Sequence, residues 1–425
     1  MKLNKFIGFC YLLLLRGMFM EKLIFLFFLV LPFTAILGNT EELGTISNNQ
    51  NDWRVSPPSD KGINRAVLEE LHNELKNGDH GYIDSFLVIK GGDIVFERYY
   101  DVNYQSLTKS SKLEQASIMR KNYGDLATAQ YNYHDTDWHP FYQETELHTI
   151  QSVTKSVTSA LFGVAIGRGE ITDLDSKIVD YFPQYQSLFQ DPVKRIITIR
   201  NLLTMASGIE WDEFTHLYTD PRNDAASMES SDDWLKFILS PPMEYQPGEK
   251  FVYNSGITIL LSHILQSSVN MPVDEYAKRF LFEPLGIENF FWKKTPTGIT
   301  DTESGLYLTS RDFAKIGLLY LNDGMWKKKQ ILPDGWVELT MTPAKDTGYQ
   351  NNKYGFQWWL APYDGGDGKW MYSGSGYGGQ YLLVIPEYDL VMVFNGWNIF
   401  DVARPAKEYL AKRVLEGVSS DKGAK

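Results

Sequence analysis

The sequence predicts an α/β (α+β) protein in which helices flank one antiparallel sheet. Strand-like runs rich in β-branched and aromatic residues occur near the start of the chain, at 85–100, and return only after residue 356. The block at 170–299 instead has apolar residues at helical spacing, with glycines and prolines that end helices. We therefore expect both chain ends to form the sheet, with an all-helical domain inserted between them.

The N-terminal part of the predicted sheet is a hairpin. Residues 66–75 have apolar side chains at helical spacing and predict a helix before it. Residues 85–90 and 93–100 are joined by two glycines, which is typical of two paired strands with a tight turn. Residues 101–146 fit neither period, and we interpret them as an insertion that covers a site or as a mobile loop.

The rest of the chain predicts helices first and strands later. The helical block contains four predicted helices, at 197–207, 232–239, 257–266 and 273–282. After it come helices at 310–321 and 336–341, strands at 356–361, 370–373, 381–385 and 390–395, and a closing helix at 403–415. The α/β domain then comprises 63–169 and 300–417, the helical domain 170–299, and the tail 418–425.

The first 38 residues predict a targeting segment. They contain four Lys or Arg residues and one Glu, a net charge of +3, and two apolar runs. The second run directly follows Met-Glu-Lys at 20–22, which is typical of a signal peptide. An uncleaved membrane anchor is the alternative, and in either case we expect export to the periplasm or the exterior. Residues 39–62 are polar and are interpreted as a linker.

The composition excludes several classes of function. The net charge is −12 for the whole chain and +3 for the leader, which leaves −15 for the body and argues against nucleic acid or an anionic membrane as a partner. The one cysteine, Cys10, lies in the leader, so the body has no cysteine chemistry and no disulfide of its own. The two histidines at 134–139 have no further histidine at a useful spacing, and we expect no metal and no cofactor.

A serine and a lysine three residues apart, Ser152 and Lys155, open a helical pattern. This spacing puts both on one helix face, so the lysine amine can touch the serine hydroxyl. In a partly desolvated site the pKa of the amine can fall, and the amine can then help to activate the oxygen. The helix has one apolar face and one face of small or polar residues, which suits the wall of a cleft. The same Ser-x-x-Lys pattern also occurs at 106–109 and 419–422, and an exposed lysine on a surface helix is the alternative interpretation.

Two further pieces stand out beside the Ser-x-x-Lys pattern. Tyr253-Asn254-Ser255 follows a Pro-Gly turn and opens a helix, and YSGSGYGGQ at 372–380 is a glycine-rich strand. In isolation Tyr253 is an ordinary aromatic at a helix start, and the glycines mark a strand bulge. A Ser-His-Asp site is the competing catalytic hypothesis, but no G-x-S-x-G motif surrounds Ser152, and we interpret His148 as a wall residue.

These pieces, in this order, resemble the motifs of the serine β-lactamase and penicillin-recognising superfamily. The resemblance is strongest to the class C β-lactamase-like branch, with its esterases, D-aminopeptidases and nylon-oligomer hydrolases. It runs from about residue 82 to 417 and includes the phrases TIRNLLTMASGI, PGEKFVYNSG, LYLTSRDFAKIGLLYLNDG and GGQYLLVIPEYDLVMVF. It implies a β-lactamase/transpeptidase-like fold.

The resemblance also implies roles for the site residues. Ser152 would attack a carbonyl to give an acyl-enzyme, Lys155 would exchange its proton, and Tyr253, with its pKa lowered by Lys155, would act as base and then as acid. Ser255 stands where the family more often has Asn, and would hydrogen-bond the lysine or the substrate. The oxyanion hole would combine the Ser152 N–H with one from the third motif. The candidates in that motif are Gly374, Ser375, Gly376 and Tyr377.

The third motif departs from the family pattern, which has Lys-Thr-Gly or His-x-Gly there. Neither the register 374–376 nor its rival 372–374 contains a cation. This favours neutral esters or amides over penicillins and D-alanyl peptides, which carry a carboxylate, although Arg311 or Lys250 could supply the charge. We expect an exported, metal-free serine hydrolase for a small ester or amide. The rival hypotheses are a β-lactamase or D-alanyl carboxypeptidase-like enzyme, and a non-catalytic binding protein of the same fold.

Overall fold

The computed structural model describes residues 53–102, 146–218, 220–349, 351–363, 370–398 and 405–419. The predicted leader, nearly all of the predicted insertion at 101–146 and the end of the tail lie outside these residues. Across the described ranges, no helix is both long and apolar enough to cross a membrane.

An antiparallel sheet of eight strands is the centre of the fold. Its strands are β1 (Ile83–Lys90), β2 (Asp93–Tyr99), β8 (Lys345–Asp346), β9 (Lys353–Tyr354), β10 (Trp359–Pro362), β11 (Trp370–Gly376), β12 (Gln380–Ile385) and β13 (Leu390–Gly396). They lie in the order β2-β1-β13-β12-β11-β10-β9-β8. The first hairpin joins the last strand, with Phe86 opposite Phe394, so both chain ends form one sheet, as predicted.

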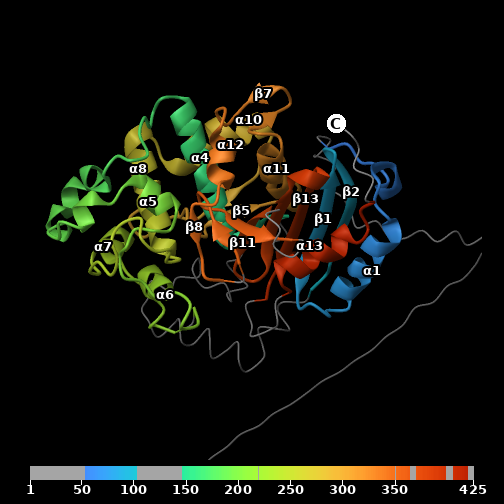
Figure 1. The fold of residues 1–425 in the computed structure, drawn as a ribbon, viewed down its shortest axis with the longest axis horizontal. Coiled ribbons are helices and arrows are strands. Elements are labelled where there is room, and N and C mark those ends of the chain that lie inside the picture. Colours follow the sequence, from blue (N-terminus) through green and yellow to red (C-terminus); the bar gives the residue numbers. More distant parts are fainter. Residues whose placement is uncertain are drawn as a thin grey trace, which may run out of the picture. The chain divides into compact units, whose positions relative to one another are not determined.

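Helices cover the two faces of this sheet. On one face lie α1 (Arg65–Lys76) and α13 (Lys407–Leu415), which Figure 1 shows side by side although they come from opposite ends of the chain. On the other face lies α11 (Ser310–Leu321), against β12 and β13. Neighbouring strand residues such as Leu382 and Leu383 belong to different core clusters, because side chains alternate between the faces of a strand. The sheet is therefore buried on both sides.

The helical part of the molecule packs beside the sheet. Its helices are α4 (Thr154–Gly167), α5 (Ile199–Leu203), α6 (Asp224–Glu229), α7 (Trp234–Leu239), α8 (Ser255–Val269), α9 (Val273–Ala277) and α10 (Glu283–Leu285), and α12 (Trp336–Met341) follows α11. A π-helical turn, η8 (Lys278–Phe282), continues α9. Short 3₁₀ helices are η1 (Pro58–Lys61), η4 (Gln151–Val153), η5 (Ile178–Tyr181), η6 (Pro183–Leu188), η7 (Lys194–Ile196) and η9 (Pro386–Tyr388).

Two small sheets complete the described structure. One has the order β3 (His148–Thr149), β5 (Leu306–Leu308) and β4 (Phe291–Trp292), and the other pairs β6 (Met325–Trp326) with β7 (Lys329–Gln330). β4 lies within the block that we predicted to be all-helical, so that block contains a short strand as well. Part of the segment interpreted as a linker also packs on the sheet, since Ser56 N donates to the Ile94 carbonyl at 3.0 Å.

The helix predicted at 197–207 is much shorter than expected. It begins at a capping box on Thr198 and ends at Leu203, and Met205 then has a left-handed φ of 55°. The carbonyl of Met205 accepts a hydrogen bond from Val252 N at 2.9 Å instead of continuing the helix. Tertiary hydrogen bonds therefore override the local helical pattern, and they hold the loop that leads to Tyr253.

Helix α4 is buried on nearly all sides, not only on the apolar face that we predicted. Its small-polar face packs against protein rather than lining an open cleft. Ser156 Oγ donates to the Gln357 carbonyl at 2.8 Å, and Gly163 faces the indole of Trp336. The small residues on this face are needed because a neighbouring helix and loop approach it closely.

The packing of α4 on α12 predicts the effect of adding one methyl group. A Cβ at Gly163 would lie 2.6 Å from Trp336 Nε1, so Gly163→Ala should lower the free energy of unfolding by about 1–3 kcal/mol through overpacking. Urea denaturation measures this change. Gly167→Ala is the matched control in the same helix, because its Cβ would meet Pro333 at 3.2 Å, where a small shift suffices. Equal stability of the two variants would contradict the packing described above.

Candidate active site

The candidate nucleophile, Ser152, lies in η4, directly before α4. The preceding residue, Gln151, has a φ of 47°, an unfavourable backbone conformation for a side chain of this size. Val153 N donates to the Ile150 carbonyl at 3.1 Å and closes the turn. A strained backbone conformation persists only where the surrounding structure holds it in place. Such conformations are common at active sites.

The Lys155 amine lies where the sequence spacing placed it. Its Nζ donates to Ser152 Oγ at 2.9 Å and to the Glu303 carbonyl at 2.8 Å, and lies 3.2 Å from Glu303 Oε2. Lys155 is 1% exposed, and Glu303 is buried as well. The serine and lysine therefore contact each other inside the protein, which excludes the surface-helix alternative.

Tyr253 lies on the loop before α8, across from Ser152 and Lys155. The centre of its ring is 5.3 Å from Lys155 Nζ, and Ser152 is among the groups that lower the pKa of its hydroxyl. The ring stacks on Phe214, at 5.1 Å, and on Trp359, at 5.7 Å between ring centres. Aromatic packing thus fixes the Tyr253 ring beside the Lys155 amine.

A second buried carboxylate, Glu213, lies at the N-terminus of α8. Its oxygens accept hydrogen bonds from Ser255 Oγ at 2.6 Å, Ser255 N at 2.8 Å, Tyr218 OH at 2.7 Å and Trp211 Nε1 at 2.9 Å. A negative charge is favourable at this end of a helix. Ser255, which we expected to contact the lysine or the substrate, therefore bonds to Glu213.

The two carboxylates change the expected electrostatics of the site. Burial alone would lower the pKa of Lys155, but the influence of Tyr253, Glu303 and Glu213 outweighs it and raises that pKa. Burial raises the pKa of Tyr253 despite the opposing effect of Lys155. Lys155 does lower the pKa of Tyr253, as expected, but burial outweighs this effect. The expected fall in the pKa of Lys155 is reversed by Tyr253 and the buried acids, which favour the charged amine.

Neither Glu213 nor Glu303 was singled out from the sequence. Burial raises the pKa of Glu213, while Lys155 and Lys293 hold the pKa of Glu303 low against the effect of burial. The signal that could have found them is their position close to two of the family-like phrases. Glu213 follows the segment that ends in Ala-Ser-Gly-Ile, and Glu303 lies just before Leu-Tyr-Leu-Thr-Ser.

The glycine-rich strand β11 runs directly beside the Ser152 turn. A Cβ at Gly374 would overlap Val153 Cγ1, and one at Gly376 would lie 2.6 Å from the Ile150 carbonyl. β10 pairs with β11 only as far as Ser373, whereas β12 pairs with it as far as Gly376. Over the described residues, the edge of β11 beyond Ser373 therefore has no strand partner on the β10 side, where a substrate could lie.

The remaining third-motif residues lie around this edge. Ser375 alternates with its neighbouring glycines and faces α13, where its hydroxyl accepts from Lys407 at 3.4 Å. The Tyr377 ring packs on Tyr218, with 4.9 Å between ring centres. Arg311 and Lys250, which we considered as replacements for the cation missing from the third motif, have other partners. Arg311 pairs with Glu97 at 2.7 Å, and Lys250 bonds to Tyr245 at 2.6 Å.

The competing Ser-His-Asp hypothesis is not supported by the position of His148. Its Nε2 lies 2.8 Å from Asp84 Oδ2, and its Nδ1 lies 2.8 Å from the Thr149 carbonyl. Both ring nitrogens therefore have partners other than Ser152, whose hydroxyl accepts from Lys155. His148 is thus a buried residue whose ring is held by Asp84 and the Thr149 carbonyl.

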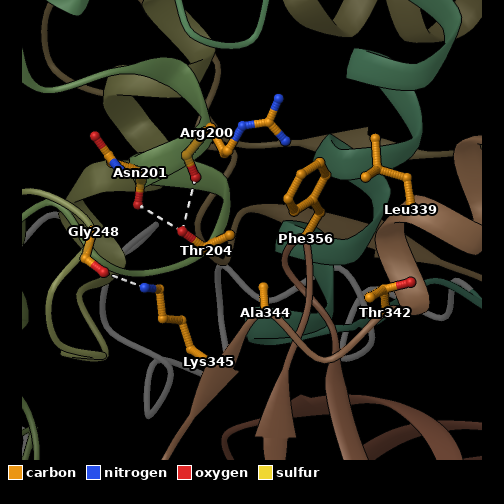
Figure 2. Close-up of a pocket in the computed structure, with 9 residues that line it drawn as sticks. All are labelled: Arg200, Asn201, Thr204, Gly248, Leu339, Thr342, Ala344, Lys345 and Phe356. Carbon is orange, nitrogen blue, oxygen red and sulfur yellow. Dashed lines mark hydrogen bonds between the residues drawn. The ribbon is translucent and has the colours of Figure 1, made fainter.

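A separate cavity of about 360 Å³ lies at Arg200, Gly248, Lys345 and Phe356. Figure 2 shows that Lys345 points to the Gly248 carbonyl, and Arg200 makes a two-pronged ion pair with Asp175 at 2.8 and 3.0 Å. Lys345 and Arg200 thus already have partners, and none of the candidate active-site residues lines this cavity. Across the described ranges, no cluster of His, Cys, Asp and Glu could hold a metal ion.

Comparison with known proteins gives one consistent result. The β-lactamase family model matches residues 84–410. The 6-aminohexanoate-dimer hydrolase of Paenarthrobacter ureafaciens is 25% identical over 273 residues, 59% of this chain and 66% of the relative. A Salmonella enteritidis protein provisionally named a D-alanyl-D-alanine carboxypeptidase is 28% identical over 254 residues, 58% of this chain and 52% of the relative. The matches thus span less than two thirds of either relative.

A solved structure supports the fold. The structure of a family VIII carboxylesterase superposes with a TM-score of 0.58 and 14% identity, covering 86% of this chain and 98% of that one. The family model covers most of the described fold, including the Ser-x-x-Lys helix, Tyr253 and β11. The chain therefore belongs to the β-lactamase family.

Proposed function

We propose that the protein is a serine hydrolase that forms an acyl-enzyme at Ser152 and acts on a small ester or amide. The observation that carries this proposal is the grouping of three side chains, in which the Lys155 amine bonds to the Ser152 hydroxyl and lies 5.3 Å from the centre of the Tyr253 ring. A nucleophile beside two groups that can move or stabilise its proton is the arrangement that covalent catalysis requires. A protein that only binds a ligand has no need to bury such a cluster.

The acylation step begins with the Ser152 hydroxyl. Its oxygen forms a bond to the substrate carbonyl carbon as the carbonyl π electrons move to the carbonyl oxygen, and its proton passes to the phenolate oxygen of Tyr253, the deprotonated form of that side chain. The proton then moves from Tyr253 to the leaving oxygen or nitrogen as the scissile bond breaks. Water attacks the acyl-enzyme in the second half of the cycle, with the same groups in the reverse order. We expect backbone N–H groups of Ser152 and of the free edge of β11, where β10 no longer pairs, to bind the oxyanion.

Lys155 acts in this scheme through its charge. An ammonium ion beside Ser152 and Tyr253 favours the deprotonated form of both hydroxyls. Glu303 and Glu213 keep that charge in place, because a buried ammonium without an anion would lose its proton. Lys155 is then the electrostatic partner of the base, and Tyr253 is the group that accepts the proton.

The substrate class follows from the rim of the site and from the relatives. The rim is aromatic, with Phe214 half exposed, and Trp359 and Tyr377 nearby, which favours a substrate with an apolar body. The named relatives include a 6-aminohexanoate-dimer hydrolase and a provisional D-alanyl-D-alanine carboxypeptidase. We therefore keep a β-lactamase or D-alanyl carboxypeptidase-like activity as the second candidate. The leader supports export of the protein.

Trapping of the acyl-enzyme tests the nucleophile. Intact mass spectrometry of the full chain should show one adduct with a fluorophosphonate, and the same for an activated ester at short times. Ser152→Ala should abolish both adducts, because the oxygen that forms the bond is gone. Ser106→Ala, in the second Ser-x-x-Lys copy, is the matched control and should retain them. The absence of any adduct in folded protein would refute the proposal, and a stable penicillin adduct would favour the second candidate.

The role of Glu303 predicts a shift in the pH profile of kcat/KM. If Tyr253 accepts the proton, kcat/KM for a neutral ester should rise with pH towards the pKa of Tyr253, which lies above its usual 10. Glu303 raises the pKa values of both Tyr253 and Lys155, so Glu303→Gln should move the profile to lower pH, by about one unit.

Profiles between pH 6 and 10.5, corrected for spontaneous hydrolysis, measure this shift. Glu210→Gln is the control, because Glu210 is an exposed carboxylate close in sequence to Glu213. Its profile should match that of the wild type. A Glu303→Gln profile that stays in place, or moves to higher pH, would rule out Tyr253 as the proton acceptor under the influence of Glu303.

A further inference from the structure

A short turn at 301–305 carries Glu303 to the catalytic lysine. Lys155 Nζ contacts two oxygens of Glu303, the carbonyl at 2.8 Å and Oε2 at 3.2 Å. The turn begins at Asp301, whose Oδ1 accepts from the N–H groups of Glu303 at 3.1 Å and Ser304 at 3.2 Å. Ser304 Oγ in turn donates to the other carboxylate oxygen of Glu303 at 2.9 Å. Asp301 thus shapes the turn that supplies Lys155 with an anion.

Hydrogen bonds from α8 hold the same turn independently of charge. Thr302 Oγ1 donates to the Thr258 carbonyl at 2.7 Å, and Ser262 Oγ donates to the Thr300 carbonyl at 2.8 Å. These bonds join hydroxyl groups to backbone carbonyls, so they do not depend on ionisation. The backbone of the turn should therefore stay in place when Asp301 loses its charge.

Asp301 is also the partner of a second buried lysine. Lys293 directly follows β4, its Nζ lies 3.6 Å from Asp301 Oδ2, and both side chains are 0% exposed. Lys293 N donates to the Gly305 carbonyl and Asp301 N donates to the Lys293 carbonyl, each at 2.9 Å. The site therefore contains two buried ion pairs in neighbouring positions, Lys155 with Glu303 and Lys293 with Asp301.

The two carboxylate oxygens of Asp301 have different surroundings. Oδ1 accepts two backbone hydrogen bonds, whereas the buried Oδ2 has no hydrogen-bond partner among the described residues, since 3.6 Å from Lys293 is too long. Burial raises the pKa of Asp301 to about 6 against the effect of Lys293, and Glu303 adds to the rise. A proton on Oδ2 would leave both backbone hydrogen bonds to Oδ1 in place.

Lys293 stays charged in this environment. Burial alone would lower its pKa, but nearby acidic groups outweigh burial and raise it. These groups are Asp301, Tyr307 of β5, Glu229 of α6 and Glu303. Near neutral pH, Lys293 is therefore a buried ammonium ion that needs an anion.

Two further carboxyl groups near these ion pairs are poorer sources of negative charge. The two lysines lower the pKa of Glu303 against burial, and Glu229 lowers it further. An ionised Glu229 would raise that pKa instead, so Glu229 acts on Glu303 as a neutral carboxyl group. Burial raises the pKa of Glu213, which acts on Lys155 from the loop after α5. The two ammonium ions are therefore balanced mainly by Glu303 and Asp301.

Loss of the Asp301 charge changes what Glu303 has to balance. While both acids are ionised, each ammonium ion has its own carboxylate. When Asp301 is neutral, two buried ammonium ions share Glu303, because neither can remain without an anion. The attraction of Glu303 to Lys155 is then divided, and the contact between them weakens.

We propose that Asp301 is a positioning residue: together with Lys293 it keeps Glu303 paired with Lys155, and protonation of Asp301 in mildly acidic solution loosens that pair. The inference rests on the proposed function, because it concerns the acid–base groups of the same site. Since Glu303 raises the pKa of Tyr253, the influence of Glu303 on catalysis should depend on the charge of Asp301.

A pair of substitutions tests this inference through the pH profile of kcat/KM for a neutral ester. Asp301→Asn keeps the Oδ1 acceptor and removes the charge, so the profile should move to lower pH by about half a unit. Adding Lys293→Met removes the competing ammonium ion, which returns Glu303 to Lys155 and should restore the wild-type profile. A purely structural role predicts that the second substitution adds to the damage. A shift that Lys293→Met does not reverse in folded protein would overturn the inference.

The Glu303→Gln background shows whether Asp301 acts through Glu303. In that background Asp301→Asn should cause no further shift, because the carboxylate that it controls is gone. A full additional shift would contradict the inference. Asp312→Asn is the matched control, since Asp312 and Lys315 form another buried ion pair, at 2.8 Å, in α11. Its profile should match that of the wild type.

A measurement on the wild-type chain covers the case in which Asp301→Asn does not fold. As the pH falls through about 6, Asp301 gains a proton, Glu303 loses influence and the pKa of Tyr253 falls. The rising limb of the profile should therefore show a shoulder near pH 6, and a limb of constant slope between pH 5 and 8 would overturn the inference. If the wild type neither hydrolyses the ester nor forms the fluorophosphonate adduct, the proposed function itself fails, which is a different outcome.

Discussion

The buried ion pair between Lys155 and Glu303 is the constraint on which the rest of the structure depends. An ammonium that is 1% exposed can stay charged only if carboxylates and carbonyl oxygens surround it. Glu303 comes from the segment between β4 and β5, and Glu213 comes from the loop after α5. The ion pairs around Lys155 therefore form only when α4, the loop after α5 and the segment between β4 and β5 pack together.

The second constraint is the close approach of β11 to the Ser152 turn. The strand can lie there only because Gly374 and Gly376 lack side chains, since a Cβ at either position would collide with Val153 or the Ile150 carbonyl. This approach brings the backbone of β11 to the Ser152 turn and leaves the edge of β11 unpaired with β10 beyond Ser373. The glycines that looked like a strand bulge in the sequence are thus required by the distance between two backbones.

The sequence was sufficient for features that depend on local pattern and insufficient for those that depend on distant partners. The hairpin at 83–99 and the contact of Ser152 with Lys155 follow from two-residue and three-residue spacing, and the structure contains both. The end of α5 at Leu203 depends on hydrogen bonds from residues some 45 positions later, such as Val252 N to Met205. Glu213 and Glu303 were missed for the same reason, because only the folded chain shows which acidic residues are buried next to Lys155.

The pKa values of two buried lysines, Lys155 and Lys407, change in opposite directions because their surroundings differ. Lys155 lies beside a fixed carboxylate, and its pKa is raised, so its charge belongs to the protein itself. Lys407 lies beside a hydroxyl and a distant acid, and burial lowers its pKa to about 8, so it loses its proton more easily than an exposed lysine. The difference lies in the partners, because a carboxylate in contact stabilises the charged amine, whereas burial without such a partner favours the neutral amine.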